Sequence, residues 1–544
     1  MKKQKLELTW IGKDEEPRLE PRILIEDPDK SYGAKDTQNM LIHGDNLLAL
    51  KALEQNFAGK IKCIYIDPPY NTGNAFEHYD DGLEHSLWLS LMKPRLELFR
   101  SLLSSDGSLW VTLDDSEFAY CKVLLDEGFG RNNFKGTIVW QHSVQGKGYE
   151  GKLSVHHNYI MVYQKSDNFK VGLLKRTEEH NKNYSNPDDD PNGLWRSGDV
   201  RNSLYRPNLI YDIHTPSGKV IKPPEKGWRW SKETVQEKIK TGEIIFSEDE
   251  ERIIRKIYLS NQKGRVPETL WFGKEVGTTR EANVHIKNMF TNDIFGTPKP
   301  ERLIERVLEL ASDENDFVLD SFLGSGTTAA VAHKMGRRWI GVELGDHCYT
   351  HCVPRLKKVC DGMDQGGISK AVDWKGGGGF KFYELAPSLL KKDKYDNWII
   401  DEQYNADMLA SAMAKHEGFK YSPSEDLYWK QGQSTEKDFI FTATQMVTAA
   451  LLDRIAEEMK PDESLLICCK SYQKACDNKY TNISIKKIPN MLLGRCEFGK
   501  EDYCLNIIDM PHDDDEPDFI PVGPEGEKKL KKKKKKDDNQ GTFF

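Results

Sequence analysis

Hydrophobic and polar residues follow one another in two stretches of the chain in patterns that predict strands and helices in turn. Residues 40–42 are apolar, 44–46 (GDN) form a turn, and leucines at 47, 48, 50 and 53 follow at helical spacing. Residues 63–66 (CIYI) are again apolar and favour a strand, and a helical pattern from 86 ends at 106–107 (DG). Strands that alternate with helices through short turns predict a mostly parallel sheet covered by helices.

The alternation is lost from 142 to 290 and returns after 291. The middle stretch is rich in aromatic residues, Asn, Pro, Lys and Arg, and it is too long for a loop, so we expect an inserted domain. The chain thus divides into six predicted parts. They are a polar N-terminal arm (1–37), one half of an α/β domain (38–141), the insert (142–290), the second half of the α/β domain (291–385), an α+β C-terminal domain without a recognisable motif (386–515) and a charged, disordered tail (516–544).

Composition narrows the class of protein. The chain has 544 residues, 38% hydrophobic and 30% charged, which suffices for several cores. No apolar run approaches the roughly 18 residues of a membrane span, and no signal-peptide pattern follows Met1. We therefore expect neither a membrane-spanning segment nor a signal peptide. Ten cysteines without a CxxC pair favour reduced thiols and a cytoplasmic protein.

The net charge of −8 is unevenly distributed. Residues 141–290 hold 25 Lys and Arg against 20 Asp and Glu, a balance of +5, which leaves −13 for the rest of the chain. A mildly basic insert suits contact with a polyanion such as nucleic acid, and an ordinary solvated surface would explain it almost as well.

The candidate catalytic group is Asp67, Pro68, Pro69 and Tyr70, which follow the apolar run 63–66 directly. Prolines end a strand because they cannot donate to its ladder. The acid and the tyrosine are therefore left at the carboxyl end of the strand, where open α/β sheets bind their ligands. Taken alone, Asp67 could cap a turn and Tyr70 could be a half-buried packing residue.

A Gly-rich turn supplies the candidate cofactor site. Asp320, Phe322, Gly324 and Gly326 lie between a strand and a helix, where glycines let the backbone approach a ligand closely. The spacing is that of neither a dinucleotide fingerprint nor a P-loop, which disfavours phosphate binding. Glu343 ends the next strand, and an acid there suits hydrogen bonds to both hydroxyls of a ribose.

The roles of Asp45 and of one group of His and Cys residues have two interpretations each. Asp45 could accept a hydrogen bond from an adenine amine, or it could cap the helix that follows it. His347, Cys348, His351 and Cys352 have the donors of a zinc site, but no second ligand pair stands at a suitable spacing. Packing is the favoured role for them, and no metal site is predicted.

Four motifs in order resemble those of the β group of S-adenosylmethionine-dependent DNA amino-methyltransferases. They are IDPPYNTG (66–73), GTTREA (277–282), TPKPERLIERVL (297–308) and FLGSGTTA (322–329). The catalytic strand precedes the cofactor loop, as in that group, and residues 38–385 look like the modification (Mod) subunits of type III restriction–modification systems. The resemblance implies a Rossmann-like methyltransferase fold, S-adenosylmethionine as cofactor and target recognition by the insert. It also implies that Lys299 and Pro300 contact the methionine end of the cofactor, with surface packing as the alternative.

The reaction that the resemblance implies is methylation of an exocyclic base amine. Asp67 and the carbonyl of Pro68 would each accept one N–H of the amine, and Tyr70 would stack on a base flipped out of double-stranded DNA. An aspartate at position 67 favours adenine N6, with cytosine N4 as the alternative. The implied partners are a second copy of the chain and a helicase-nuclease restriction subunit, and the alternative is an orphan methyltransferase.

Two interpretations from other classes compete with methyl transfer. A DNA-binding module with a relic cofactor site is opposed by the intact Asp67, Tyr70 and Glu343. An NAD-dependent enzyme that uses the Gly-rich turn would leave the DPPY strand end and the large insert without a role.

Overall fold

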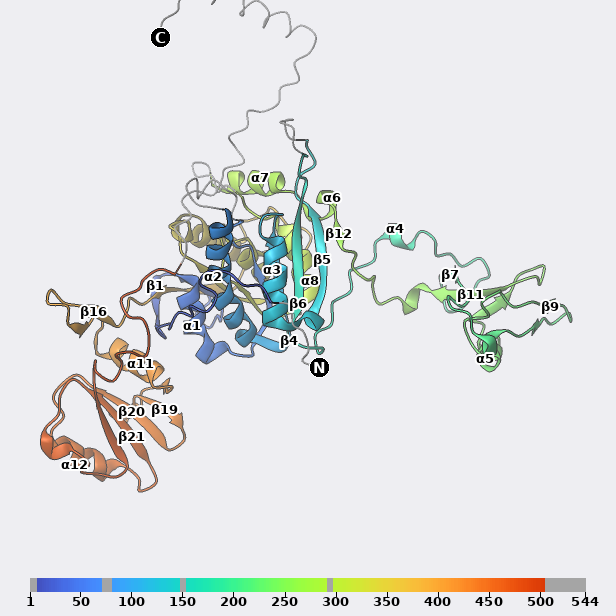
Figure 1. The fold of residues 1–544 in the computed structure, drawn as a ribbon. Coiled ribbons are helices and arrows are strands. Elements are labelled where there is room, and N and C mark those ends of the chain that lie inside the picture. The colour runs from blue at the N-terminus through green and yellow to red at the C-terminus, as the bar shows by residue number, and fades with distance from the viewer. Residues whose placement is uncertain (1–6, 71–80, 147–152, 291–296, 504–544) are drawn as a thin grey trace, which may run out of the picture.

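The computed structural model describes residues 7–70, 81–146, 153–290 and 297–503, and its centre is a ten-stranded mixed sheet (Figure 1). The strand order is β1-β15-β2-β14-β13-β3-β4-β6-β5-β12. In chain order these strands are β1 (Leu24–Gly33), β2 (Met40–His43), β3 (Ile61–Ile66), β4 (Leu103–Leu113), β5 (Phe134–Gln141), β6 (His157–Gln164), β12 (Leu270–Trp271), β13 (Phe317–Asp320), β14 (Arg338–Glu343) and β15 (Gly379–Leu385).

Helices cover both faces of this sheet. One face carries α1 (Asn46–Phe57), α2 (Asp81–Leu102) and α3 (Phe118–Leu125), and the other carries α8 (Glu301–Ala311), α9 (Thr327–Lys334) and α10 (Val353–Cys360). Cys63 and Tyr65 of β3 pack in one hydrophobic cluster, whereas Ile64 and Ile66 pack in the other, because successive strand residues point to opposite faces. The neighbouring strands from β15 to β4 are parallel, which confirms the predicted α/β fold with its permuted order.

Three strands of the sheet lie where the sequence pattern predicts other structure, and one of them, β12, falls in the predicted insert and pairs parallel with β5. β1 falls in the predicted arm and pairs antiparallel with β15, and its half-buried or exposed residues carry no apolar pattern. β6 falls in the predicted insert and pairs antiparallel with β4 and β5. Antiparallel neighbours need no crossover helix, so the strand–helix alternation stops there although the sheet continues.

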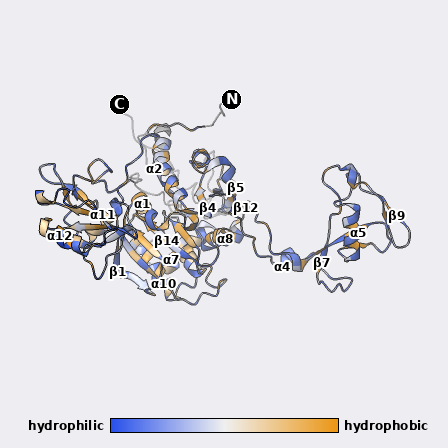
Figure 2. Ribbon diagram, turned by 90° about the horizontal axis from the view of Figure 1, so that it is seen from below, coloured by the Kyte–Doolittle hydropathy of each residue, from blue (hydrophilic) through white to orange (hydrophobic). Residues whose placement is uncertain are grey.

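Residues between 174 and 265 form a smaller body that stands away from the sheet in both views (Figures 1 and 2). Two backbone hydrogen bonds between Leu174 and Arg265, of 3.0 and 2.9 Å, close its base. Trp228 and Val235 are at the centre of its small core. Its elements are α4 (Glu178–Asn181), β7 (Trp195–Gly198), η3 (Pro207–Leu209), β8 (Ile213–His214), β9 (Val220–Ile221), α5 (Lys232–Lys240), β10 (Ile244–Phe246), β11 (Ile253–Tyr258) and η4 (Leu259–Asn261).

The chain returns to the main body at β12, and α6 (Gly273–Val276) and α7 (Thr279–Met289) follow it. Short irregular helices also flank the sheet, namely η1 (Asp126–Gly130), η2 (Arg131–Asn133) and η5 (Cys348–Cys352).

The C-terminal part has its own five-stranded sheet, in the order β18-β19-β20-β21-β22, with α11 and α12 (Figure 1). Its elements are β16 (Leu390–Lys392), β17 (Trp398–Ile400), α11 (Ala406–His416), β18 (Lys420–Tyr421), β19 (Gly432–Thr435), β20 (Asp438–Ala443), α12 (Ala449–Glu458), β21 (Ser464–Cys469), η6 (Lys474–Cys476) and β22 (Ile483–Lys487). The tail predicted at 516–544 lies outside the described residues. Among the helices of the described part, none is long and apolar enough to cross a bilayer.

Candidate active site at the carboxyl edge of the sheet

Four acids follow four adjacent parallel strands and meet at one edge of the sheet. Asp45 comes after β2, Glu343 ends β14, Asp320 ends β13 and Asp67 comes after β3, and these strands are neighbours in that order. Carboxyl ends of parallel strands meet at the same edge, so the topology brings together residues that lie up to 298 positions apart (343 − 45).

Asp67 and Tyr70 form a compact polar group. The Tyr70 hydroxyl donates to Asp67 Oδ1 over 2.7 Å. The ammonium of Lys299, a residue of the segment before α8, pairs with Asp67 Oδ2. The same ammonium lies 5.3 Å from the centroid of the Tyr70 ring. Burial, and then the negative charge of Asp67, raise the pKa of Tyr70 well above its usual value of 10.0, so its hydroxyl stays a donor at neutral pH.

Two residues that the sequence analysis did not single out hold this turn. The Trp88 indole N–H of α2 donates to the Pro69 carbonyl over 2.7 Å, and the Asn158 amide of β6 donates to the Tyr70 hydroxyl over 3.4 Å. Trp88 is fully buried within a helical apolar pattern, which marks it only as a core residue. Asn158 belongs to β6, which the strand–helix alternation did not predict. Only its contact with Tyr70 identifies it as part of this group.

Asp320 begins the Gly-rich turn as a buried carboxyl group. It accepts the Phe322 backbone N–H over 2.9 Å and the Thr328 hydroxyl over 2.6 Å. Burial nevertheless dominates and raises the pKa of Asp320 from 3.8 to about 7, and the charges of Asp67 and Glu343 act in the same direction. Ser321 adds a buried hydroxyl oxygen with no hydrogen-bond partner in the described structure.

Glu343 is held by donors from two directions. The Gly324 backbone N–H donates to its Oε2 over 2.7 Å, and those of Leu344 and Gly345 donate to Oε1 over 2.9 and 3.0 Å. The His347 imidazole lies 2.9 Å from the same Oε1. Burial acts to raise the pKa of Glu343, but the hydrogen bond and charge of His347, together with the backbone donors, lower it, so the group stays ionised.

Asp45 has a structural role in this arrangement. It is buried and caps α1 by accepting the Leu48 backbone N–H over 3.0 Å, which is the alternative that the sequence offered. The Tyr503 backbone N–H also donates to Asp45, over 3.0 Å, and the Arg95 guanidinium lies 3.7 Å away. A contact of Asp45 with a cofactor stays a prediction.

Pro300 and Phe322 occupy apolar positions beside the polar groups. Pro300 precedes α8 directly, and a side chain on Gly277 would come within 2.6 Å of its Cβ. Phe322 is half-buried and packs against the same hydrophobic cluster as Tyr70.

The four residues considered for zinc are engaged in the fold. Cys348, His351 and Cys352 are buried in η5, and the Cys352 thiol donates to the Gly324 carbonyl over 3.1 Å. His347 pairs with Glu343 instead. The first of these contacts places Cys352 behind the Gly-rich turn, and packing stays the prediction for Cys348 and His351.

The turn and the strand end beside it fit an adenosyl cofactor. Gly324 and Gly326 have φ of +55° and +79°, a conformation that favours glycine and turns the backbone sharply at the end of β13. The unpartnered Ser321 hydroxyl and the ionised Glu343 supply polar groups for hydroxyls and an amine.

Comparison with known proteins identifies relatives. A family model described as "DNA methylase" (N6_N4_Mtase) matches residues 61–353, more than half of the chain. The probable type III restriction-modification enzyme HindVI Mod subunit of Haemophilus influenzae is 35% identical over 417 residues, which cover 64% of this chain and 54% of that protein. The StyLTI Mod subunit of Salmonella typhimurium is 31% identical over 362 residues, covering 59% of this chain and 55% of that protein.

A type II relative shares much of the same region. The methyltransferase M.KpnI of Klebsiella pneumoniae is 33% identical over 327 residues, which cover 54% of this chain and 76% of that protein. The chain spans about half the length of the two Mod subunits. The family match covers β3, the Asp67–Tyr70 turn, the Gly-rich turn and Glu343, and on this evidence the chain belongs to the N6/N4 DNA methylase family.

Proposed function

We propose that the protein is a site-specific DNA methyltransferase that transfers a methyl group from S-adenosylmethionine to adenine N6. The observation that carries this proposal is the meeting of the Asp67–Tyr70 group with the Asp320 turn and Glu343 at one sheet edge. These groups all lie within the segment that matches the DNA methylase family.

The cofactor half would bind through groups of known placement. Glu343 offers carboxylate oxygens to the ribose hydroxyls, and the turn of Ser321, Phe322 and Gly324 offers backbone and hydroxyl groups. Lys299 and Pro300 reach the same edge from the segment before α8. When bound, S-adenosylmethionine supplies an activated methyl group.

The catalytic half would bind the target base. An exocyclic amine is a weak nucleophile because its lone pair is delocalised into the ring. Asp67 and the Pro68 carbonyl each accept one N–H, which draws the nitrogen towards a tetrahedral shape and makes its lone pair available. Tyr70 stacks on the base, whose removal from the duplex costs a few kcal/mol. The Trp88 and Asn158 contacts keep the turn in place for this task.

Adenine N6 is the proposed target because the motif begins with aspartate and because two of the relatives described are Mod subunits of type III enzymes. Cytosine N4 is the alternative within the same family. Recognition of the target sequence falls to the body between 174 and 265, a narrower insert than 142–290. A restriction subunit, a second copy of the chain and a cytoplasmic location complete the proposal.

The deciding experiment is long-read sequencing of genomic DNA from a methylation-free host that expresses the protein or its Asp67→Ala variant. We expect modified adenines in one short motif with the wild-type protein and none with Asp67→Ala. The matched control is Asp106→Ala, because Asp106 also pairs with a lysine, Lys62, but at the opposite end of β3. Modified cytosines would select the alternative, and full methylation by Asp67→Ala would refute the catalytic assignment.

A further inference from the structure

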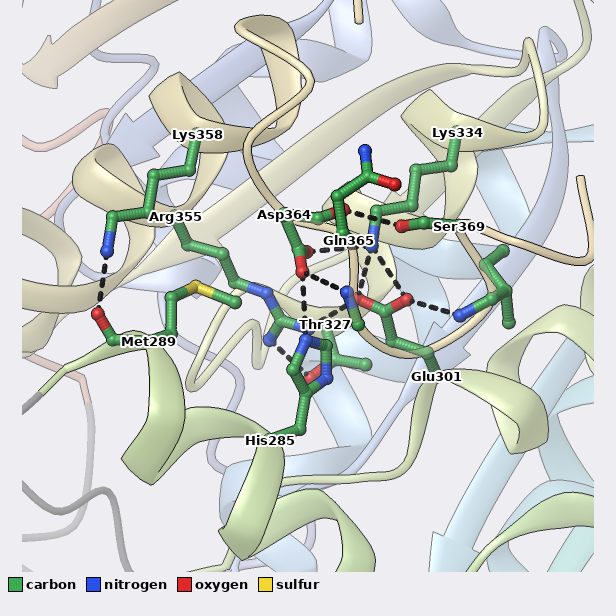
Figure 3. Close-up of polar contacts among 12 residues, drawn as sticks. His285, Met289, Glu301, Thr327, Lys334, Arg355, Lys358, Asp364, Gln365 and Ser369 are labelled. Carbon is green, nitrogen blue, oxygen red and sulfur yellow. Dashed lines mark hydrogen bonds and ion pairs between the residues drawn. The ribbon is translucent and has the colours of Figure 1, made fainter. Parts of the chain in front are cut away.

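A buried cluster of charges lies behind the Gly-rich turn (Figure 3). Glu301 of α8, Lys334 of α9, Arg355 of α10 and Asp364 have side chains that are at most 2% exposed. The Lys334 ammonium lies 2.8 Å from Glu301 and 2.7 Å from Asp364, and the Arg355 guanidinium lies 2.8 Å from Glu301. Two cations thus balance two anions in the protein interior, which holds three helices and the Asp364 segment in one arrangement.

The cluster is not a metal site. His285, Glu301 and Asp364 come close enough to share an ion. The Lys334 ammonium, however, already donates to both oxygens of Glu301, over 2.9 and 2.8 Å, and to Asp364 over 2.7 Å. A cation therefore occupies this position as part of the chain itself.

Arg355 connects the cluster to the turn. One arm of its guanidinium donates to Glu301, while the other donates to the Ser325 carbonyl over 3.1 Å and to the Thr327 hydroxyl over 2.9 Å. Ser325 lies between the two glycines of the turn, and the Gly324 N–H donates to Glu343. A planar guanidinium can make these contacts at once, and the single ammonium of a lysine cannot.

The other side of the cluster reaches α7, the helix of the GTTREA motif. His285 of α7 lies 2.9 Å from Asp364, and Lys358 of α10 donates to the Met289 carbonyl over 2.6 Å (Figure 3). A side chain on Gly366 would come within 2.3 Å of the His285 ring, and one on Gly367 within 2.0 Å of Glu301. The segment after Asp364 therefore packs closely against α7 and Glu301, and a side chain at either glycine would displace His285 or Glu301 from the cluster.

We infer that Arg355 is a positioning residue for the cofactor turn, and that the cluster couples this turn to α7, which follows the return of the chain from the insert at β12. This inference rests on the proposed function for the identity of the cofactor. Arg355 fixes the backbone of Ser325 and so fixes where Gly324 and Glu343 present their groups. Movement of α7 acts on the same network through His285 and Asp364.

The first test measures Arg355→Lys in the full-length protein. The variant keeps the positive charge but loses the bridge between Glu301 and Ser325. We expect binding of S-adenosylmethionine, measured by calorimetry, to weaken by about tenfold or more, the effect of removing one charged hydrogen bond. We also expect faster hydrogen exchange at the amides of 323–328 in the cofactor-free protein. Unchanged affinity together with unchanged exchange would overturn the role of Arg355.

Two further variants separate positioning from stability. Lys430→Met breaks a lysine–glutamate pair with Glu463 in the C-terminal sheet, and it should change stability without changing cofactor affinity. Thr327→Val removes one acceptor of Arg355 and leaves every charge in place, so it should weaken cofactor binding even if Arg355→Lys fails to fold. Wild-type affinity in Thr327→Val, or an equal loss of affinity in Lys430→Met, would overturn the inference.

The link to α7 has its own measurement. Cofactor binding should slow hydrogen exchange across 279–289 in the wild-type protein, and His285→Ala should abolish this slowing. Persistence of the effect in His285→Ala would overturn the coupling. If the wild-type protein does not bind S-adenosylmethionine, the proposed function fails, while exchange at 323–328 in the cofactor-free variants still decides whether Arg355 positions the turn.

Discussion

The buried charge cluster of the core differs from two exposed ion pairs of the insert, although the insert also holds one buried pair, Lys256 with Asp190, whose side chains are 5% and 6% exposed. In the core cluster, Glu301, Lys334 and Arg355 are at most 1% exposed and lie 21 to 54 positions apart in sequence. In the insert, Arg201 pairs with Asp199 two positions away, with exposures of 70% and 55%, and Lys222 pairs with Asp212, with exposures of 75% and 40%. The core pairs connect separate helices, whereas these two insert pairs connect only residues that are close in sequence.

The difference in burial sets what each pair can do. Exposed pairs are screened by water and salt and contribute about 0–1 kcal/mol, so a phosphate can replace their carboxylate at small cost. Removing one partner of a buried pair costs about 3–5 kcal/mol because the other charge is left unpaired. The core cluster is therefore suited to holding groups in a fixed arrangement, whereas the exposed pairs of the insert can exchange partners, as the DNA binding that we propose for it would require.

The largest effect should follow from removing the insert. Leu174 and Arg265 are hydrogen-bonded neighbours, so a short Gly-Ser turn can replace the residues between them. We expect genomic methylation to be lost entirely, while thermal unfolding of the core and binding of S-adenosylmethionine persist. A shortened protein that still methylates one short motif would contradict the proposal that the insert recognises the target sequence.

Asp320→Asn should separate stability from function within the core. The pKa of Asp320 in the folded protein is about 7, above the ordinary 3.8, so the folded state binds the proton more tightly. Wild-type stability must then fall as pH rises from about 4 to about 7, and the variant escapes this loss. At pH 8, without cofactor, we expect the variant to unfold with a free energy higher by on the order of 2–4 kcal/mol.

The measurement is chemical unfolding of both proteins at pH 5 and pH 8, with cofactor binding as a second readout. Binding at pH 8 should be lost in Asp320→Asn, because the wild-type carboxyl group is mostly ionised there and the variant removes that charge at the start of the turn. If the difference in unfolding free energy between the two proteins is the same at pH 5 and pH 8, ionisation of Asp320 does not destabilise the folded protein.

A smaller effect is expected from the exposed charges of the insert. Arg201→Ala combined with Lys222→Ala should reduce the slope of log affinity for DNA against log salt by about 0.9 for each phosphate that the protein no longer neutralises. The free energy of unfolding should change by no more than about 0.5 kcal/mol. Lys375→Ala is the matched control, because Lys375 is 79% exposed and pairs with Asp373 outside the insert. An equal change of slope in the control would contradict the expectation that the exposed cations of the insert contact the phosphates of DNA.

The smallest effect concerns His347. Burial acts to lower its pKa, but the hydrogen bond and charge of Glu343 raise it above 6.5. The stabilising pair is fully present below the unfolded value of 6.5 and is lost as pH rises through the folded value. His347→Gln should therefore lower the melting temperature more at pH 5.5 than at pH 8.5, by on the order of 1 °C. A difference of opposite sign would contradict the assigned pairing.

Most of the core could be predicted because its signals are local. The apolar run of β3, the prolines that end it, and the Gly-rich turn before α9 each specify structure within a few residues. β1 escaped prediction because a half-exposed edge strand carries no apolar pattern. β6 has an apolar run at 159–163, but it follows β5 as an antiparallel return without a helix between them, so the strand–helix alternation did not reveal it. The same reason hid Asn158, whose contact with Tyr70 spans 88 positions.

The sequence by itself determined the strand ends and the chemistry placed on them: an acid and a tyrosine beside two prolines, a Gly-rich turn, and an acid closing the following strand. Only the tertiary structure decided which of these groups meet and in what state. The segment before α8 places Lys299 beside Asp67, burial raises the pKa of Asp320 to about 7, and His347 together with backbone donors lowers the pKa of Glu343 and keeps it ionised. These outcomes depend on solvent exclusion and on distances between residues far apart in the chain, and neither quantity is encoded in any single stretch of sequence.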